Sequence, residues 1–487
     1  MRVVILLPMV WSVRNVVHGG VLHALARAGV EAHLIVWGGG RLRAPAERDL
    51  FADAAGVHPL IEPPGHTPRG KAFVDAVLTS AFQRRHRICS YGIYRHWFTR
   101  HDGPAARGRS AMVESLGWLA ASSIGVNAME RVATRIARRS RDLGPVIEQL
   151  RAIEPDLIWS TVNVSSREQP YRLAARALGI PVVTSILSFD NLTSRGPLPR
   201  DDHYLVWGVR MKTQLLRFYP QLVPQQVTIT GTPQFDFHRR REFLWARQRT
   251  LRALGLDWRR RYLLYGASHA SLTPEEPELV AQLAARLGER PALADHALIL
   301  RLHPLDEPAR WRAALRDSDR VHLSAPFASA TIADGWALPT REDYARLTSS
   351  LAHADACLNV ASTMSLDAAI LDRPVVCIDF TRESDSPRDM LYAEYAAEHY
   401  APLVASGGLR VAHSWRELLD LIELAVSHPE RDREHRARMV DAECGPVDGC
   451  AAQRVSRALI LLARDARREE PAVHPRAATA RSVEVRR

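Results

Sequence analysis

The sequence is poor in lysine and cysteine and contains no long apolar stretch. Lys71 and Lys212 are the only lysines among 65 lysines and arginines, so arginine carries the positive charge. The five cysteines include no CxxC pair, which argues against structural zinc and is typical of a reducing compartment. No run of about 18 uncharged apolar residues occurs, so we predict no membrane-spanning helix. We expect a cytoplasmic protein without a bound metal ion.

The N-terminal segment MRVVILLPMV is apolar but only about one strand long. The chain then continues as a predicted helix from His18 to Ala28 and a predicted strand from Glu31 to Trp37. This continuation is unlike a cleaved signal peptide. The N-terminus therefore reads as the start of a βαβ unit.

The whole chain has 487 residues, 46% of them apolar, and it alternates helices and strands in two separate series. Such alternation predicts mostly parallel, doubly wound sheets with ligands at the carboxyl ends of the strands. We predict an α/β fold of two doubly wound Rossmann-like lobes that face a cleft. The predicted divisions are a first, acceptor-side lobe (1–240), a linker (241–261), a second, donor-binding lobe (262–450), a C-terminal helix that crosses back (451–466) and a disordered tail (467–487).

A basic helical insertion interrupts the first lobe at about residues 63–141. From Arg84 to Arg141 there are twelve arginines against three acidic residues. This excess suits an anionic membrane surface or a polyanionic acceptor, and the simpler alternative is a solvated surface in an arginine-rich protein. We do not expect nucleic acid as a partner, because no nucleic-acid-binding module accompanies the charge. Peripheral attachment to the inner face of the cytoplasmic membrane is one prediction.

The segment HADACLNVASTMSLDAAILDRPVVCIDF, from His353 to Phe380, reads as strand, hydroxyl-rich turn, helix and strand. Its turn brings Ser362, Thr363 and Ser365 to a helix start, where hydroxyls and free N–H groups suit phosphate oxygens. Asp367 in the first turn can accept hydrogen bonds from ribose hydroxyls. An ordinary βαβ crossover with a capped helix explains the same pattern.

Other candidate donor-binding residues follow predicted strands. In HALILRLHP, Arg301 and His303 emerge at the end of a buried strand and can hold a diphosphate, although a histidine beside a proline turn is often structural. GASHAS offers Ser268 and His269 across the same cleft. Two more candidates, Gly231 and Thr232 of TITGTPQFD, permit close backbone approach to a ligand or form a plain turn.

The first lobe supplies the candidate bases. SFDNLTSRG contains Asp190 and Asn191; the carboxylate suits a general base, and the amide can hold the acceptor hydroxyl. A capped loop accounts for them equally well. MVWSVRNVVHGG contributes His18 as a second candidate base, or as a helix cap, with Arg14 and Asn15 on the acceptor side.

Taken together, these motifs resemble the GT-B glycosyltransferase superfamily, and within it bacterial surface-polysaccharide transferases related to CDP-glycerol glycerophosphotransferases. The similarity lies in the order SFDNLTSRG, VTITGTPQFD, LRLHP and STMSLDAAILDRPVV, and it covers about residues 155–380. It implies that Arg301 and His303 contact the donor phosphates. It further implies that Ser362 and Thr363 contact the diphosphate and Asp367 the ribose.

UDP-N-acetylglucosamine 2-epimerases of the same superfamily are the second resemblance. They have an HRREN-like stretch after the first strand of the second lobe, whereas GASHASL lacks the following arginine and glutamate. The similar HRRRE, from His238 to Glu242, precedes that strand, in the predicted linker. This position disfavours an epimerase.

We therefore predict transfer of a glycosyl or glycerophosphoryl group from a nucleotide donor to a hydroxyl of a polysaccharide or glycolipid acceptor. The reaction is predicted to need no metal and no cofactor, with Asp190 or His18 as base. A non-catalytic nucleotide-sugar-binding scaffold at the membrane is an alternative from another functional class.

Overall fold

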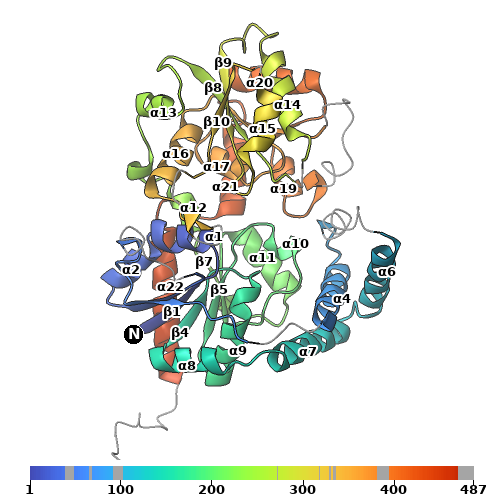
Figure 1. The fold of residues 1–487 in the computed structure, drawn as a ribbon, viewed down its shortest axis with the longest axis vertical. Coiled ribbons are helices and arrows are strands. Elements are labelled where there is room, and N and C mark those ends of the chain that lie inside the picture. Colours follow the sequence, from blue (N-terminus) through green and yellow to red (C-terminus); the bar gives the residue numbers. More distant parts are fainter. Residues whose placement is uncertain are drawn as a thin grey trace, which may run out of the picture.

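The computed structural model describes residues 1–38, 49–64, 69–90, 103–270, 273–316, 318–327, 331–332, 336–380 and 394–469. These residues form two α/β lobes stacked end to end (Figure 1). The predicted α/β fold of two Rossmann-like lobes is confirmed. Among the described residues, no helix combines the length and apolarity needed to cross a membrane.

The first lobe is built on a seven-stranded parallel sheet in the order β3-β2-β1-β4-β5-β6-β7. Its strands are β1 (Arg2–Leu7), β2 (Glu31–Val36), β3 (Gly56–Pro59), β4 (Leu157–Ser160), β5 (Val182–Ser185), β6 (His203–Val206) and β7 (Val227–Ile229). The helical elements after the insertion are α8 (Gly144–Ile153), η3 (Ser166–Glu168), α9 (Gln169–Leu178), α10 (Asn191–Ser194), α11 (Val209–Phe218), η4 (Pro224–Gln226) and α12 (Pro233–Asp236). Strands β1, β4 and β6 are largely apolar and buried, as expected for a parallel sheet covered on both faces, whereas the edge strand β3 is partly exposed.

The start of the first lobe corrects one predicted boundary. The chain forms α1 (Val10–Val13) and a π-helical turn η1 (Arg14–His18) before α2 (Val21–Arg27). The helix predicted from His18 therefore begins at Val21. Gly20 separates the two pieces with a φ of 95°, a conformation that L side chains rarely adopt. His18 consequently ends a turn instead of starting the helix.

The second lobe contains a six-stranded parallel sheet in the order β10-β9-β8-β13-β14-β15. Its strands are β8 (Arg261–Gly266), β9 (His296–Arg301), β10 (Val321–Ser324), β13 (Cys357–Asn359), β14 (Val375–Ile378) and β15 (Arg410–Ala412). A short antiparallel pair, β11 (Thr331–Ile332) and β12 (Trp336–Ala337), lies outside this sheet. The helices are α14 (Glu276–Leu287), α15 (Pro308–Leu315), α16 (Arg341–Ala352), α17 (Met364–Ile370), α19 (Ala401–Ala405), α20 (Trp415–Ser427) and α21 (Arg433–Cys444).

The C-terminal helix α22 (Ala451–Glu469) returns to the first lobe, as predicted, and lies along it in Figure 1. Its apolar side packs against α2 and the β1–β4 part of the sheet, with Val455 and Leu459 buried. Asp236 of α12 accepts hydrogen bonds from the first two backbone N–H groups of α22, at 3.1 and 3.0 Å. The helix extends three residues into the segment predicted to be a disordered tail, and the rest of that segment lies outside the described residues.

The basic insertion is helical, as predicted. It comprises α4 (Arg69–His86), α6 (Pro104–Leu119) and α7 (Ser123–Arg139), which lie beside the first lobe (Figure 1). Residues 91–102, which hold part of the basic stretch, lie outside the described residues. The insertion also reaches the second lobe, since the Glu398 carboxylate accepts a hydrogen bond from the Ser90 backbone N–H at 2.9 Å.

The segment predicted as a linker is packed rather than extended. It forms η5 (Arg241–Phe243) and α13 (Arg247–Ala253), which contact α16 of the second lobe. Phe243 and Trp245 are buried together with Phe237 and Tyr344. Aromatic packing thus fixes the end of the first lobe against α16.

Candidate active site

The two lobes meet through a hydrogen-bonded pair. His238 follows α12 of the first lobe, and Asp367 lies in the first turn of α17 in the second. The His238 Nε2 atom is 2.7 Å from Asp367 Oδ1, and Nδ1 lies 3.2 Å from the Thr348 hydroxyl. Both ring nitrogens of this buried histidine are occupied, so its orientation is fixed.

Arg301 is the last residue of β9, at the carboxyl end of that strand. Its guanidinium interacts electrostatically with Asp343, Arg346, Asp367 and Tyr344. Burial lowers the pKa of Arg301 to about 10. One guanidinium nitrogen donates to the Pro326 carbonyl at 3.1 Å, whereas Nη1 is buried and has no partner in the described part of the chain. The site thus contains a buried cation with an unused donor.

Helix α16 contributes two more unused groups beside Arg301. The Tyr344 hydroxyl and the Arg346 Nε are buried, and neither has a hydrogen-bond partner among the described residues. Burial raises the pKa of Tyr344, so its hydroxyl stays protonated and can donate. Buried polar groups without partners are rare, so several in one place mark a candidate binding site.

His18 of η1 faces the same helix from the first lobe. Its ring lies 5.1 Å from the Tyr344 ring, and burial lowers its pKa to about 4, so the imidazole is neutral near pH 7. The ring is hydrogen-bonded to the backbone of Pro339, which has no N–H, so the ring donates to the carbonyl. Nε2 is unpartnered within the described residues and keeps its lone pair. His18 can therefore accept a proton.

Arg14 adds a third guanidinium to the lobe contact. It hydrogen-bonds to Gln234 of α12, and its Nε lies 3.1 Å from the Asn15 side-chain oxygen. Burial lowers its pKa, while Tyr344 and Asp367 act in the opposite direction. Asn15 therefore orients Arg14. No hydrogen bond in the described part of the chain joins the Asn15 side chain to the second lobe.

The balance of charge at this contact is positive. Arg14, Arg301 and Arg346 stand against Asp343 and Asp367, and Asp343 already caps its own helix by accepting from the Thr340 backbone N–H at 2.7 Å. Arginine forks match the geometry of phosphate oxygens. The arrangement is suited to an anion with several oxygen atoms, held between the lobes.

A second contact between the lobes contains Asp190. Its carboxylate accepts from the Ser194 hydroxyl at 2.6 Å and from the Asn191 amide at 3.3 Å. Burial opposes the ionisation of Asp190. Its pKa is nevertheless lowered by four side chains, those of His399 of the second lobe, Ser188, Ser194 and Arg195. Asn191 is buried and orients the loop by accepting from the Ser188 N–H. Asp190 is therefore a held carboxylate with both oxygens in use.

No family model matches the sequence. No curated protein matches it either. Among solved structures, UDP-GlcNAc 2-epimerase from Neisseria meningitidis superimposes with a TM-score of 0.54 and 13% identity, over 95% of this chain and 100% of that one. The enzyme from Methanocaldococcus jannaschii gives 0.52 and 13%, over 95% and 100%. A putative UDP-N-acetylglucosamine 2-epimerase from Listeria monocytogenes gives 0.53 and 14%, over 97% of each chain.

The fold is GT-B. At these identities the similarity establishes the architecture and leaves the reaction open. The predicted GT-B architecture is thereby confirmed, and α1 and α12 of the first lobe lie where the two lobes meet (Figure 1).

Within the GT-B framework, the hydroxyl-rich turn is only partly exposed to the lobe contact. Ser362 and Thr363 are half-buried, and the Ser362 hydroxyl accepts from the Met364 N–H at 3.2 Å. Ser365 is fully buried, with its hydroxyl 2.8 Å from that of Tyr400. The prediction that Ser365 faces phosphate is therefore wrong, because its side chain points into the core. Helix α17 has only seven residues, so its dipole contributes little.

Two other predicted donor contacts also have structural roles. Ser268 is buried, and its hydroxyl and N–H both donate to Glu276, whose pKa burial raises to about 7. Gly231 has a φ of 70°, and a Cβ there would come within 2.8 Å of the Pro446 carbonyl oxygen. Gly231 thus accommodates the returning C-terminal segment, and the adjacent Thr232 is buried beside it. Neither Ser268 nor Gly231 contributes to the polar surface between the lobes.

His269 and His303 lie together but apart from the Arg301 guanidinium contacts. Their rings are 5.4 Å apart and nearly perpendicular. His303 Nδ1 accepts from the Leu305 N–H at 3.2 Å, and burial together with His269 lowers the pKa of His303. Arg301 and His303 were predicted to hold the diphosphate together, but their described contacts are with different residues.

Sequence reasoning missed three residues at this site. His238 belongs to the HRRRE stretch that was set aside because it precedes the second lobe, and Tyr344 and Arg346 lie on an ordinary amphipathic helix. They meet Arg301 of β9, His18 and each other only through tertiary packing on α16, so no local pattern identifies them. Among the described residues, no cluster of three or more His, Cys, Asp or Glu side chains is arranged to hold a metal ion.

Proposed function

We propose that this protein is an enzyme that transfers a glycosyl or glycerophosphoryl group from a nucleotide donor to an acceptor hydroxyl. The observation that carries the proposal is the set of unused buried polar atoms at the lobe contact, Arg301 Nη1, Arg346 Nε, Tyr344 OH and His18 Nε2. Donor diphosphate oxygens would satisfy the first three, and the acceptor hydroxyl the fourth.

His18 is the better candidate for the base. Its Nε2 keeps a free lone pair, whereas both carboxylate oxygens of Asp190 already accept hydrogen bonds. In the proposed step, the acceptor oxygen forms the new bond while its proton passes to His18 Nε2. The bond from the transferred group to the leaving phosphate oxygen breaks, and the arginines stabilise the departing nucleotide. Asp190 and Asn191 would hold the acceptor-side loop.

The nucleotide would lie along the second lobe. Asp367, fixed by His238, would accept from ribose hydroxyls, and the half-buried Ser362 and Thr363 would contact the diphosphate. The three guanidinium groups supply positive charge at the leaving phosphate, so the proposed transfer needs neither a metal ion nor a cofactor.

One observation supports 2-epimerisation of a nucleotide sugar as a second candidate function. His238, the first residue of HRRRE, is at the lobe contact and bonded to Asp367, although it precedes the second lobe in sequence. The solved structures of similar fold include 2-epimerases. An epimerase would act on the donor alone, without an acceptor hydroxyl.

The insertion is proposed to dock on an anionic membrane surface. Six exposed apolar side chains occur on α6 and α7, with Trp118, Leu119 and Ile124 between 67% and 80% exposed. Arginines on the same helices, including Arg109 and Arg131, are also exposed. Aromatic and aliphatic side chains beside arginine suit the interface of a bilayer that contains acidic lipids.

Phosphorus NMR of the purified protein with each candidate donor distinguishes the functions. Transfer predicts release of free nucleotide that depends on a hydroxyl acceptor and is lost in His18→Gln. Conversion of the donor into its epimer without acceptor would replace this proposal with the epimerase. Donor binding without either product would indicate a non-catalytic scaffold.

A further inference from the structure

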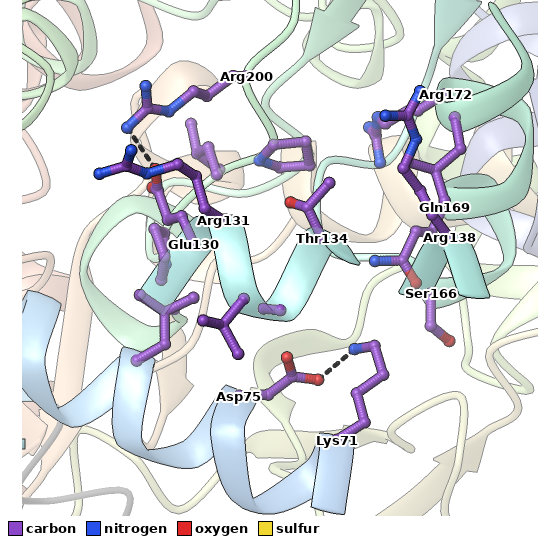
Figure 2. Close-up of a pocket in the computed structure, with 18 of the residues that line it drawn as sticks. Lys71, Asp75, Glu130, Arg131, Thr134, Arg138, Ser166, Gln169, Arg172 and Arg200 are labelled. Atoms are coloured by element: carbon purple, nitrogen blue, oxygen red, sulfur yellow. Dashed lines mark hydrogen bonds and ion pairs between the residues drawn. The ribbon is translucent and has the colours of Figure 1, made fainter. Parts of the chain in front are cut away.

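A large cavity lies between the insertion and the first lobe, separate from the candidate active site. Its volume is about 1200 Å³. One wall is the α7 face bearing Arg131, Thr134 and Arg138, and the opposite wall includes Gln169 and Arg172 of α9 (Figure 2). Helix α4, residues 163–166 and the loop 195–201 also contribute to the lining.

The charge of this lining is strongly positive. Nine basic side chains line the cavity, Lys71, Arg131, Arg135, Arg138, Arg139, Arg172, Arg176, Arg195 and Arg200, against three acidic ones, Asp75, Glu130 and Asp201. Each acidic side chain is already paired, with Lys71, Arg200 and Arg172 respectively. The other six arginines have no carboxylate partner within 4 Å in the described part of the chain. The cavity therefore has unneutralised cations on both walls.

A buried side chain in the lining also has an unused donor. Asn163 follows β4, lines the cavity and is 4% exposed. Its carbonyl accepts from the Leu187 N–H at 3.1 Å, but Nδ2 has no acceptor among the described residues. An anion inside the cavity would satisfy this donor.

The cavity is connected to the acceptor side of the active site through one loop. Leu187, whose N–H donates to the Asn163 side chain, is three residues before Asp190. Arg195, which lines the cavity, interacts electrostatically with the Asp190 carboxylate. A chain bound along α7 would therefore lead towards the carboxyl edge of the first-lobe sheet, where the acceptor hydroxyl is expected.

We infer that this cavity binds phosphate groups of the acceptor, so that the acceptor is a phosphate-bearing chain or lipid diphosphate instead of a neutral glycan. Arginine is suited to this ligand because its planar fork binds two phosphate oxygens at once. This inference rests on the proposed transfer reaction and specifies its second substrate.

The test is calorimetric titration of the full-length protein with inorganic tripolyphosphate. The variant Arg131→Gln/Arg138→Gln removes two cavity cations on one helix face. The control Arg457→Gln/Arg464→Gln removes two exposed arginines with the same spacing on α22. We expect the cavity variant to bind at least about tenfold more weakly than the wild type, and the control to bind like the wild type. Equal weakening in both variants, or no binding to the wild type, would overturn the inference.

Two further titrations separate this site from others. Tripolyphosphate binding that is lost in Arg301→Gln but unaffected in Arg131→Gln/Arg138→Gln would place the only phosphate site at the lobe contact, refuting the cavity and sparing the proposed function. Vesicles of phosphatidylglycerol provide the other comparison. If they bind through Arg131 and Arg138 while soluble tripolyphosphate does not, the cations serve lipid headgroups and the acceptor inference is wrong.

Discussion

The His238 Nε2 and Asp367 Oδ1 atoms, 129 residues apart in sequence, lie 2.7 Å apart and join the two lobes. Because the Thr348 hydroxyl occupies the other ring nitrogen, the histidine cannot turn away from the carboxylate without losing two contacts. This pair fixes Asp367 at the position where the nucleotide is proposed to bind.

Removing either member of this pair should weaken donor binding. We expect His238→Ala and Asp367→Ala each to lower the affinity for the nucleotide about tenfold, and the double variant to lose no more than the worse single variant, because the two residues act as a unit. Calorimetry measures all three. Asp432→Ala, which breaks the Arg410 pair on the second lobe, is the matched control. Additive losses, or unchanged affinity in Asp367→Ala, would remove Asp367 from the site.

Arg301 should show a trade-off between stability and binding. Its buried guanidinium has an unused nitrogen, so Arg301→Met should stabilise the free protein by on the order of 1 kcal/mol while it weakens nucleotide binding. Thermal unfolding with and without nucleotide measures both effects. A lower melting temperature in the free variant would mean that Arg301 is a structural residue.

The pH dependence of stability should depend on His18. Its pKa is about 4 in the folded protein against 6.5 ordinarily, so the unfolded chain binds a proton first as the pH falls. The contribution of the neutral His18 to the free energy of unfolding is therefore complete above pH 6.5, and it declines as the pH falls from 6.5 to 4. We expect His18→Gln to remove on the order of 3 kcal/mol of this decline. Denaturant unfolding across that range measures it, and parallel curves for variant and wild type would contradict the burial of a neutral imidazole.

Much of the fold could be predicted from sequence because each strand and helix has its own local pattern. The strands β1, β9 and β14 each contain a continuous apolar run, which is typical of a buried parallel strand. Side-chain direction at the turns was harder to predict. Ser365 and Ser268 occupy turn positions where a hydroxyl can face a ligand. Their hydroxyls instead hydrogen-bond to buried partners, Tyr400 and Glu276 respectively, which the local sequence pattern does not reveal. Tyr344 and Arg346 become site residues only through the packing of two lobes.

Membrane docking should depend on the exposed tip of the insertion. We expect Trp118→Ser/Ile124→Ser to reduce cosedimentation with phosphatidylglycerol vesicles several-fold, since both side chains are well exposed beside arginines. Trp258→Ser removes a similarly exposed tryptophan from the loop before β8 and should have no effect. Binding that ignores the acidic lipid content, or that falls equally in the control, would count against this surface.

The central claim is that a nucleotide diphosphate binds between the lobes on Arg301. The most direct measurement is calorimetric titration of the wild type and of Arg301→Gln with UDP-, GDP- and CDP-sugars and CDP-glycerol. The account predicts that one nucleotide class binds the wild type and binds Arg301→Gln at least about tenfold more weakly. Binding of equal strength to both proteins, or of no nucleotide to the wild type, would contradict it.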